Sequence, residues 1–286
     1  PILSVITNVG LDHTDVLGDT IADIAREKAG IIKNGVPVVS GAVHPDAASV
    51  IRETARERKS SLYELGVHFR HESKTVEKGR QTFDFTGPFR KYSDMAIRMD
   101  GRHQQANAAV ALMALEVLRQ YYAVYVEEED LYAALESTAW KGRLETVAER
   151  PQTVLDGAHN PDGAKALADA LTSVYAYRNL VFVLGMIRNK NHREYLRHIL
   201  PIVNTLIVTE PDFHKKMPAG ELAAEARAMR EDESLQIQVE PDWRAALGLA
   251  RAAASPDDLV AVSGSLYLVS DARSLLLQLT DSEKGW

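Results

Sequence analysis

The sequence predicts an α/β protein of two domains, the second built on a mostly parallel, doubly wound sheet. Short apolar runs typical of buried strands alternate with longer amphipathic stretches typical of helices through most of the 286 residues. The stretch from about 62 to 100 instead alternates apolar and polar residues, as antiparallel β-hairpins do. We place the domain boundary near Arg143, which predicts domains at 1–143 and 144–286.

The first domain opens with an apolar run at 1–9 (PILSVITNV), which predicts a buried parallel strand. A helix should follow, with Asp19 or Thr20 as its N-cap and Gly30 at the position that favours a left-handed residue after a helix. The remaining expected elements are a short buried strand at 36–40 and helices at 46–59, 104–121 and 128–137.

In the second domain, the segment TVLDGAHNPDGAKALADAL has the layout of strand, tight loop and helix, with Asn160 or Asp162 available as the helix cap. Further buried strands are expected at 180–184, 205–208 and 259–264. Because strands and helices alternate, we expect parallel pairing, with ligands bound beyond the C-terminal ends of the strands.

Composition excludes several classes of function. A net charge of −7 argues against nucleic-acid binding, which requires an excess of Lys and Arg. No apolar run is long enough to span a bilayer, and no leader peptide is visible. The absence of cysteine removes disulfides, thiol catalysis and thiolate zinc sites. We expect a cytoplasmic monomer that binds neither nucleic acid nor membranes.

The first chemically rich loop is GLDHTDVLG, in which His13 lies between two carboxylates, Asp12 and Asp15. One interpretation is a helix-capping loop rich in Asp. The other is a metal or acid/base site, because its two glycines allow the backbone to approach a ligand closely. The residue types alone favour zinc or manganese over magnesium, which prefers oxygen ligands.

Two helical residues stand out. Lys28 lies in the last turn of the first helix, where the macrodipole favours a cation and solvation is the ordinary interpretation. Asn107 lies on an otherwise apolar helix face, just after Gln104 and Gln105. A buried amide there must be paired, either with neighbouring backbone or with a ligand.

The loop LDGAHNPDG follows a predicted strand that ends at Leu155. A turn and a helix cap explain Asn160 and Asp162, but they explain neither Asp156 nor His159. A carboxylate and an imidazole at the end of a buried strand indicate function. Neither of the common phosphate-binding glycine patterns, GxxxxGK[ST] and GxGxxG, is present in the chain.

In order along the chain, the motifs TNVGLDHTDVLG with EKAGI, GRHQQANAAVAL, WKGRLE, LDGAHNPDGA and SGSLYLVSDAR resemble those of the folylpolyglutamate synthase and dihydrofolate synthase family, among the Mur-type ATP-dependent amide ligases. The resemblance covers essentially the whole chain. It implies the C-terminal part of a Mur-ligase-type ATPase domain followed by a Rossmann-like domain. The family's triphosphate loop would precede residue 1, so we expect this chain alone to be inactive.

The resemblance also implies roles for individual residues. His13 would bind a catalytic magnesium ion, and Lys28 would be carboxylated by carbon dioxide, which supplies carbamate oxygens to the same metal and makes Lys28 catalytic. Asn107, Arg143 and Asp156 would lie around ATP, with the fork of Arg143 donors suited to phosphate. His159 would lie close to the reacting groups.

The implied reaction is the ATP-dependent addition of L-glutamate to folate or dihydropteroate through an acyl phosphate. Two alternatives remain open at this point. One is another Mur-type ligase that acts on a peptidoglycan precursor or on cyanophycin. The other is a non-catalytic fragment that binds a nucleotide.

Overall fold

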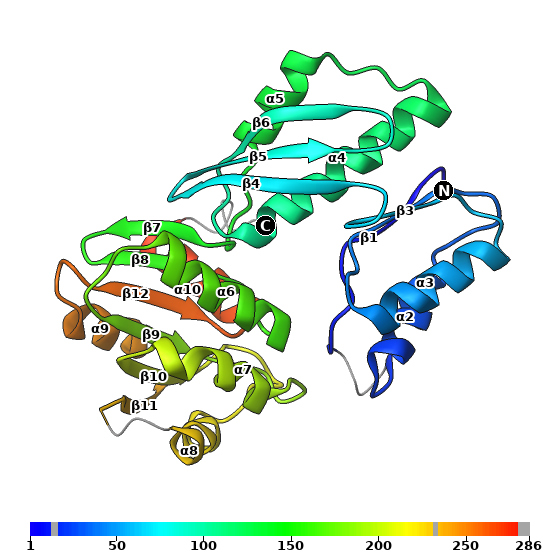
Figure 1. Ribbon diagram of the computed structural model, residues 1–286. Coiled ribbons are helices and arrows are strands. Elements are labelled where there is room, and N and C mark those ends of the chain that lie inside the picture. The colour runs from blue at the N-terminus through cyan, green and yellow to red at the C-terminus, as the bar shows by residue number, and fades with distance from the viewer. Residues whose placement is uncertain (13–16, 231–233, 280–286) are drawn as a thin grey trace. The chain divides into compact units, whose positions relative to one another are not determined.

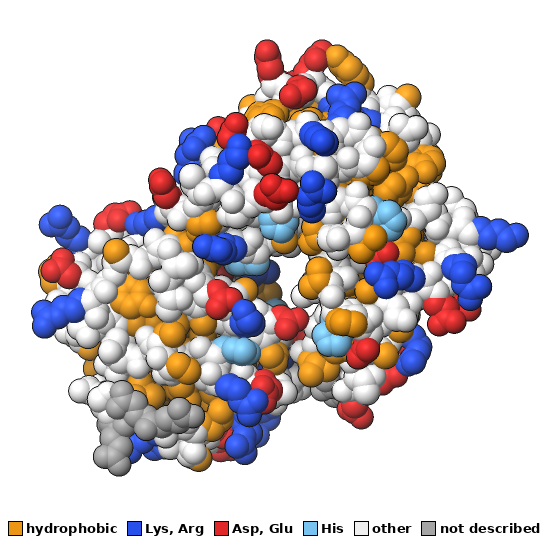
Figure 2. Space-filling model, in the orientation of Figure 1, with side chains coloured by type: hydrophobic (Ala, Val, Ile, Leu, Met, Phe, Trp, Pro, Cys, Tyr) orange, Lys and Arg blue, Asp and Glu red, His pale blue; other side chains and the backbone are white. Residues whose placement is uncertain are grey.

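The computed structural model describes residues 1–12, 17–230 and 234–279 (Figure 1). The chain divides into two compact units, Pro1–Ala139 and Trp140–Trp286. No helix in the described ranges is long and apolar enough to cross a membrane. On the face shown in Figure 2, acidic and basic side chains are interspersed over both units.

The first unit begins with a small parallel sheet in the order β1-β2-β3. Its strands are β1 (Ser4–Ile6), β2 (Val38–Ser40) and β3 (Leu62–Glu64). The helices α2 (Ile21–Ala29) and α3 (Pro45–Glu57) pack together and bury Ile24 and Ile51 in a cluster with Ile6. The strand predicted at 1–9 is therefore shorter than expected, and it is not wholly buried. Val5 within β1 is 37% exposed, and Ile2 before the strand is 54% exposed.

The ends of α2 test the predicted capping residues. Thr20 is the N-cap, and its side chain accepts a hydrogen bond from the Asp23 N–H at 3.1 Å, which confirms that prediction. The left-handed conformation expected of Gly30 is wrong, because its φ of −56° is right-handed. The chain makes one further turn there, in which the Gly30 N–H donates to the carbonyl oxygens of Arg26 and Glu27. After α2, the first residue with a left-handed backbone is Gly35, with φ +69°.

An antiparallel sheet completes the first unit, with the order β4-β5-β6. Phe83 and Met95 of this sheet share a core with Leu112 and Met113 of the long helix below it. The antiparallel region expected from residue 62 begins only at Arg70, because β3 pairs in parallel with β2. The elements are β4 (Arg70–Glu77), β5 (Arg80–Thr86), β6 (Lys91–Ile97), α4 (Arg102–Tyr122) and α5 (Glu128–Ser137).

The second unit is built on a six-stranded sheet in the order β11-β10-β9-β12-β8-β7. Every neighbouring pair is parallel except β7 with β8, which confirms the predicted, mostly parallel sheet. The strands are β7 (Glu145–Glu149), β8 (Gln152–Leu155), β9 (Leu180–Leu184), β10 (Thr205–Glu210), β11 (Gln236–Asp242) and β12 (Leu259–Ser263).

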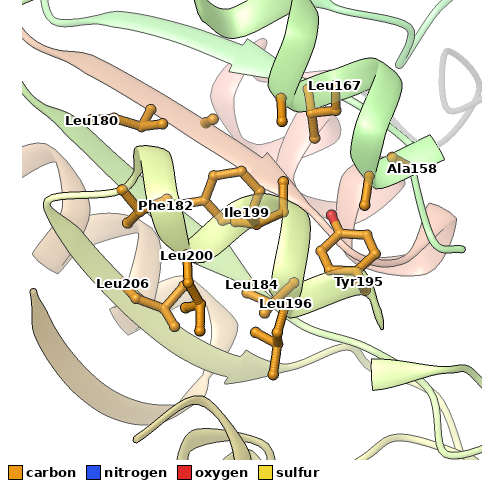
Figure 3. Packing of buried hydrophobic residues seen from close by; sticks show 14 of the residues in the cluster. Ala158, Leu167, Leu180, Phe182, Leu184, Tyr195, Leu196, Ile199, Leu200 and Leu206 are labelled. Carbon is orange, nitrogen blue, oxygen red and sulfur yellow. The ribbon is translucent and has the colours of Figure 1, made fainter. Parts of the chain in front are cut away.

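Helices cover both faces of this sheet (Figure 1). Phe182 and Leu184 of β9 point to one face, where they pack with Tyr195 and Leu196 (Figure 3). Val181 of the same strand joins the cluster on the other face. The first face carries α6 (Pro161–Val174), α7 (His192–Ile199), the short helix η1 (Leu200–Ile202) and α8 (Ala219–Met229), and the second carries α9 (Trp243–Ala253) and α10 (Leu266–Leu276).

Candidate functional site

The predicted site residues fall into both units. His13 lies outside the described residues. Lys28 occupies the last turn of α2, as predicted, and is half-buried. Its Nζ donates a hydrogen bond to the carbonyl oxygen of Asn8 at 3.0 Å. Lys28 therefore reaches the loop that follows β1, the loop in which the sequence places His13.

The donor atoms around Lys28 test whether magnesium suits this place. Among the described residues, no group of three or more His, Cys, Asp or Glu side chains could hold a metal ion. An ammonium group has no lone pair for a cation, whereas the Asn8 carbonyl is a hard oxygen donor. A carboxyl group on Lys28 would add two oxygens beside the Asn8 carbonyl, the ligand type that magnesium prefers.

Asn107 lies in the second turn of α4, on the exposed side of the helix. Its Nδ2 donates to Oε1 of Gln104 at 2.9 Å. The prediction of a buried amide on an apolar face is wrong, because the buried stripe of α4 runs through Gln104, Gln105, Ala108 and Ala109 and leaves Asn107 beside it.

A cavity of about 210 Å³ lies next to Asn107 in the first unit. Most of its wall is apolar, with the amides of Gln104 and Asn107 among the few polar groups. The lining residues are Ile97, Met99, Gln104, Asn107, Ala108, Ala111, Leu135 and Thr138.

One wall of this cavity is fixed by Gln81, a fully buried residue of β5. Its Nε2 donates to the carbonyl oxygens of Met99 at 2.5 Å and of Gly101 at 3.0 Å. These bonds hold the loop between β6 and α4. Sequence reasoning missed Gln81, because its partners lie about 20 residues away along the chain.

In the second unit, Asp156 follows β8 and is only 8% exposed. Its Oδ2 accepts from the Leu144 N–H at 3.0 Å, and its Oδ1 accepts from the Ala158 N–H at 2.8 Å. Burial raises the pKa of the Asp156 carboxyl, against the opposing effects of these two N–H groups and of Arg143 and His159. The carboxyl group thus ties the WKGRLE turn to the LDGAHNPDG loop.

The turn that presents Arg143 has an unusual backbone. Gly142 has φ +67° and Leu144 has φ +47°. The left-handed conformation costs a residue with a side chain about 1–2 kcal/mol, so surrounding bonds must hold it. The Asp156 bond to the Leu144 N–H is one of them. Arg143 itself is half-buried.

A second carboxylate also holds this turn. Oε2 of Glu145 accepts from the Gly142 N–H at 2.7 Å, and both oxygens of Glu145 accept from Nε of Arg273 at 2.9 Å. Glu145 ends the WKGRLE motif and Arg273 ends the SGSLYLVSDAR motif. The motifs were visible in the sequence, but no signal in it joined these two residues.

His159 lies two residues beyond Gly157, and its Nδ1 is 2.8 Å from the Gly157 carbonyl oxygen. A carbonyl oxygen can only accept, so Nδ1 carries a proton and, in the neutral ring, Nε2 does not. Next to it, Asn160 caps α6 by accepting from the Gly163 N–H at 2.8 Å, as predicted. The structure therefore brings Arg143, Asp156 and His159 together at the end of β8.

Family comparisons agree with the division of the chain. Residues 1–115 match the family described as Mur ligase middle domain, and residues 142–266 match the family described as Mur ligase, glutamate ligase domain.

Among curated proteins, the dihydrofolate synthase/folylpolyglutamate synthase of Bacillus subtilis is 33% identical over 279 residues, which cover 96% of this chain and 63% of the relative. The folylpolyglutamate synthase of Lacticaseibacillus casei is 31% identical, over 97% of this chain and 62% of the relative. The chain thus spans somewhat less than two thirds of the length of these relatives.

Solved structures of similar proteins have the same fold. The Mycobacterium tuberculosis folylpolyglutamate synthase complexed with ADP and AMPPCP matches with a TM-score of 0.86 at 28% identity, over 96% of this chain and 63% of that one. The Thermotoga maritima folylpolyglutamate synthase matches with a TM-score of 0.75 at 29% identity, over 99% of this chain and 63% of that one.

Proposed function

The chain belongs to the Mur ligase family, and from this premise we propose that it acts in the ATP-dependent joining of L-glutamate to folate or dihydropteroate. The observation that carries the proposal is the bonding of Asp156 to the N–H groups of Leu144 and Ala158. These bonds hold the Arg143 turn at the C-terminal end of a strand, where α/β sheets bind their ligands.

In this proposal Asn107 and Arg143 bind ATP, and Asp156 acts indirectly by holding the turn that presents Arg143. Asn107 and the apolar cavity beside it take the base, because the cavity pairs apolar walls with a few amides. The guanidinium of Arg143 takes phosphate through its fork of donors. Asp156 acts through the backbone of the Arg143 turn, since both its oxygens are bonded to N–H groups.

Lys28, as a carbamate, and His13 hold magnesium in this proposal. Bound magnesium would neutralise charge on the phosphates during transfer. The role of Lys28 is supported by its position, since its Nζ already contacts the Asn8 carbonyl in the loop after β1.

The reaction joins two anions in two steps. The substrate carboxylate takes the γ-phosphoryl group of ATP, and the amine of L-glutamate then attacks the acyl phosphate and expels phosphate. A proton must leave the amine as the amide bond forms. His159 suits this transfer, because its Nδ1 bond to the Gly157 carbonyl leaves Nε2 as the basic nitrogen of the neutral ring.

The names of the relatives favour folate over muramyl peptides or cyanophycin as the substrate class. We also propose a cytoplasmic monomer, with residues 1–143 and 144–286 as its two functional domains. The two named alternatives remain distinguishable by experiment.

The test is phosphate release from ATP by the polypeptide that carries this sequence in the cell. Release should require L-glutamate together with folate or dihydropteroate. Release driven by muramyl peptides would establish the rival ligase. Nucleotide binding without release under any substrate combination would establish the non-catalytic alternative.

A further inference from the structure

We infer that Gly157 is a positioning residue, whose missing side chain provides the space in which the Arg143 guanidinium lies. The inference rests on the proposed role of Arg143 in binding nucleotide phosphate. It assigns a reason to Gly157, the first glycine of the LDGAHNPDG loop, which neither the turn nor the helix cap explains.

The space around Gly157 supports the inference directly. A Cβ atom built on Gly157 would come closer than 3.0 Å to Nη1 of Arg143 and to Cδ2 of Leu266. The nearest backbone atom, the Gly142 carbonyl oxygen, would be 3.5 Å away, an ordinary contact. Gly157 is not among the glycines with positive φ, so its backbone conformation does not require glycine. The requirement comes from the side chains that lie against it.

The backbone of Gly157 is held in place. Its N–H donates to the Gly142 carbonyl at 2.8 Å, and its carbonyl accepts from Nδ1 of His159 at 2.8 Å. A fixed backbone means that an added methyl group would move the side chains above it. The guanidinium therefore lies on a rigid surface, beside Leu266 at the start of α10.

The guanidinium of Arg143 has unused hydrogen-bonding capacity. In the ranges that the structure describes, this guanidinium makes no hydrogen bond or salt bridge with a protein group. Its positive charge nevertheless acts on Asp156, where it lowers the pKa of the carboxyl. A half-buried guanidinium that is placed by packing keeps its donors for an anion. Gly157 and Leu266 provide that packing surface.

Comparison with other glycines shows why alanine at Gly157 would move side chains and not strain the backbone. A Cβ at Gly41 would meet the carbonyl group of Thr7, and Gly264 has φ +102°, so alanine at either position would strain the backbone. At Gly157 both crowding atoms are the ends of flexible side chains. Gly157→Ala should therefore fold and displace the guanidinium.

The experiment is a double-mutant cycle on ADP affinity, measured by calorimetry with the polypeptide that carries this sequence in the cell. Arg143→Ala should weaken ADP binding by about 10-fold, the loss expected for one charged hydrogen-bond donor group. Gly157→Ala should weaken it to a similar extent, and the double variant should be no weaker than Arg143→Ala alone. The matched control is Gly220→Ala in α8, where a Cβ has nothing within 4 Å, and it should bind as the unaltered chain does.

Each other outcome contradicts a specific step. Unchanged affinity in Gly157→Ala, or losses that add in the double variant, would overturn the role of Gly157. Failure of that polypeptide, without substitutions, to bind ADP would instead overturn the proposed nucleotide site, and the positioning role with it. A crystal structure of Gly157→Ala provides a readout without nucleotide, since an unmoved guanidinium would overturn the inference.

Discussion

Lys28 would contribute differently to the protein as an ammonium group and as a carbamate. As an ammonium it contributes one hydrogen bond to the Asn8 carbonyl, worth about 0.5–1.5 kcal/mol. As a carbamate it gains two oxygens and can bind a hard cation. Its position in the last turn of α2 was predictable, because helix periodicity and the EKAGI motif fix it, but its bond to Asn8 was not.

In the complete enzyme that carries this sequence, Lys28→Ala should reduce ligase turnover by about 100-fold or more, because it removes a metal ligand that stabilises transferring charge. The midpoint of thermal unfolding should change little, since only one hydrogen bond is lost. Lys33→Ala is the matched control, because Lys33 donates to the Gly30 carbonyl at 2.8 Å in the same way. Near wild-type turnover in Lys28→Ala would contradict the metal-binding role. A carbamate signal after incubation with ¹³C-bicarbonate, absent in the variant, would identify the modification.

Asp156 allows a prediction at the same scale. In the folded protein the two carboxylate oxygens of Asp156 accept from the N–H groups of Leu144 and Ala158. Asp156→Asn replaces one of these oxygens with an NH₂ group, which then faces a backbone N–H that has lost its acceptor. The unsatisfied donor should reduce the free energy of unfolding by about 1–3 kcal/mol. Chemical denaturation measures this loss. Asp169→Asn, which breaks an exposed bridge to Lys165, should cost less than about 0.5 kcal/mol. Equal losses in the two variants would contradict the structural role of Asp156.

Elements differ in how far the sequence determines them. The strands β9 and β12 and the helix α5 lie within a residue of their predicted ends. Both strands are continuous apolar runs that are buried along their whole length. The strand β11 was missed, since its side chains alternate irregularly between exposed and partly buried. At Gly30 local propensity gave the wrong conformation, because the following turn supplied other partners. Glu145 and Arg273 were missed for a related reason, since their contact spans 128 residues.

Asp258, just before β12, links two loops of the second unit, the one that contains Ser255 and the one that contains Asn179. It accepts from the Ser255 N–H and hydroxyl and from the Asn179 N–H and amide. Burial acts to raise the pKa of its carboxyl, but these hydrogen bonds prevail and hold the pKa below 3.8. Because the folded pKa is the lower one, the stabilisation is present above pH 3.8 and is lost as the pH falls through the folded pKa.

Asp258→Ala should therefore lower the free energy of unfolding most at neutral pH, and the difference from the unaltered chain should narrow below about pH 4. Urea denaturation across that pH range measures both curves. Asp257→Ala, at an exposed neighbouring position, provides the control and should give curves parallel to those of the unaltered chain. A constant difference at every pH would show that the carboxylate charge contributes nothing.

At the scale of the whole molecule, each unit has its own hydrophobic core. Among the residues that the structure describes, two buried clusters consist of residues from Pro1–Ala139, and two consist of residues from Trp140–Trp286. Units of about 140 residues with separate cores are large enough to fold alone. The fragments 1–139 and 140–286 should therefore each give a cooperative thermal transition by circular dichroism. A fragment without such a transition would show that its core depends on the rest of the chain. Asp258→Ala should lower the midpoint temperature of the transition of the fragment 140–286, which contains this residue.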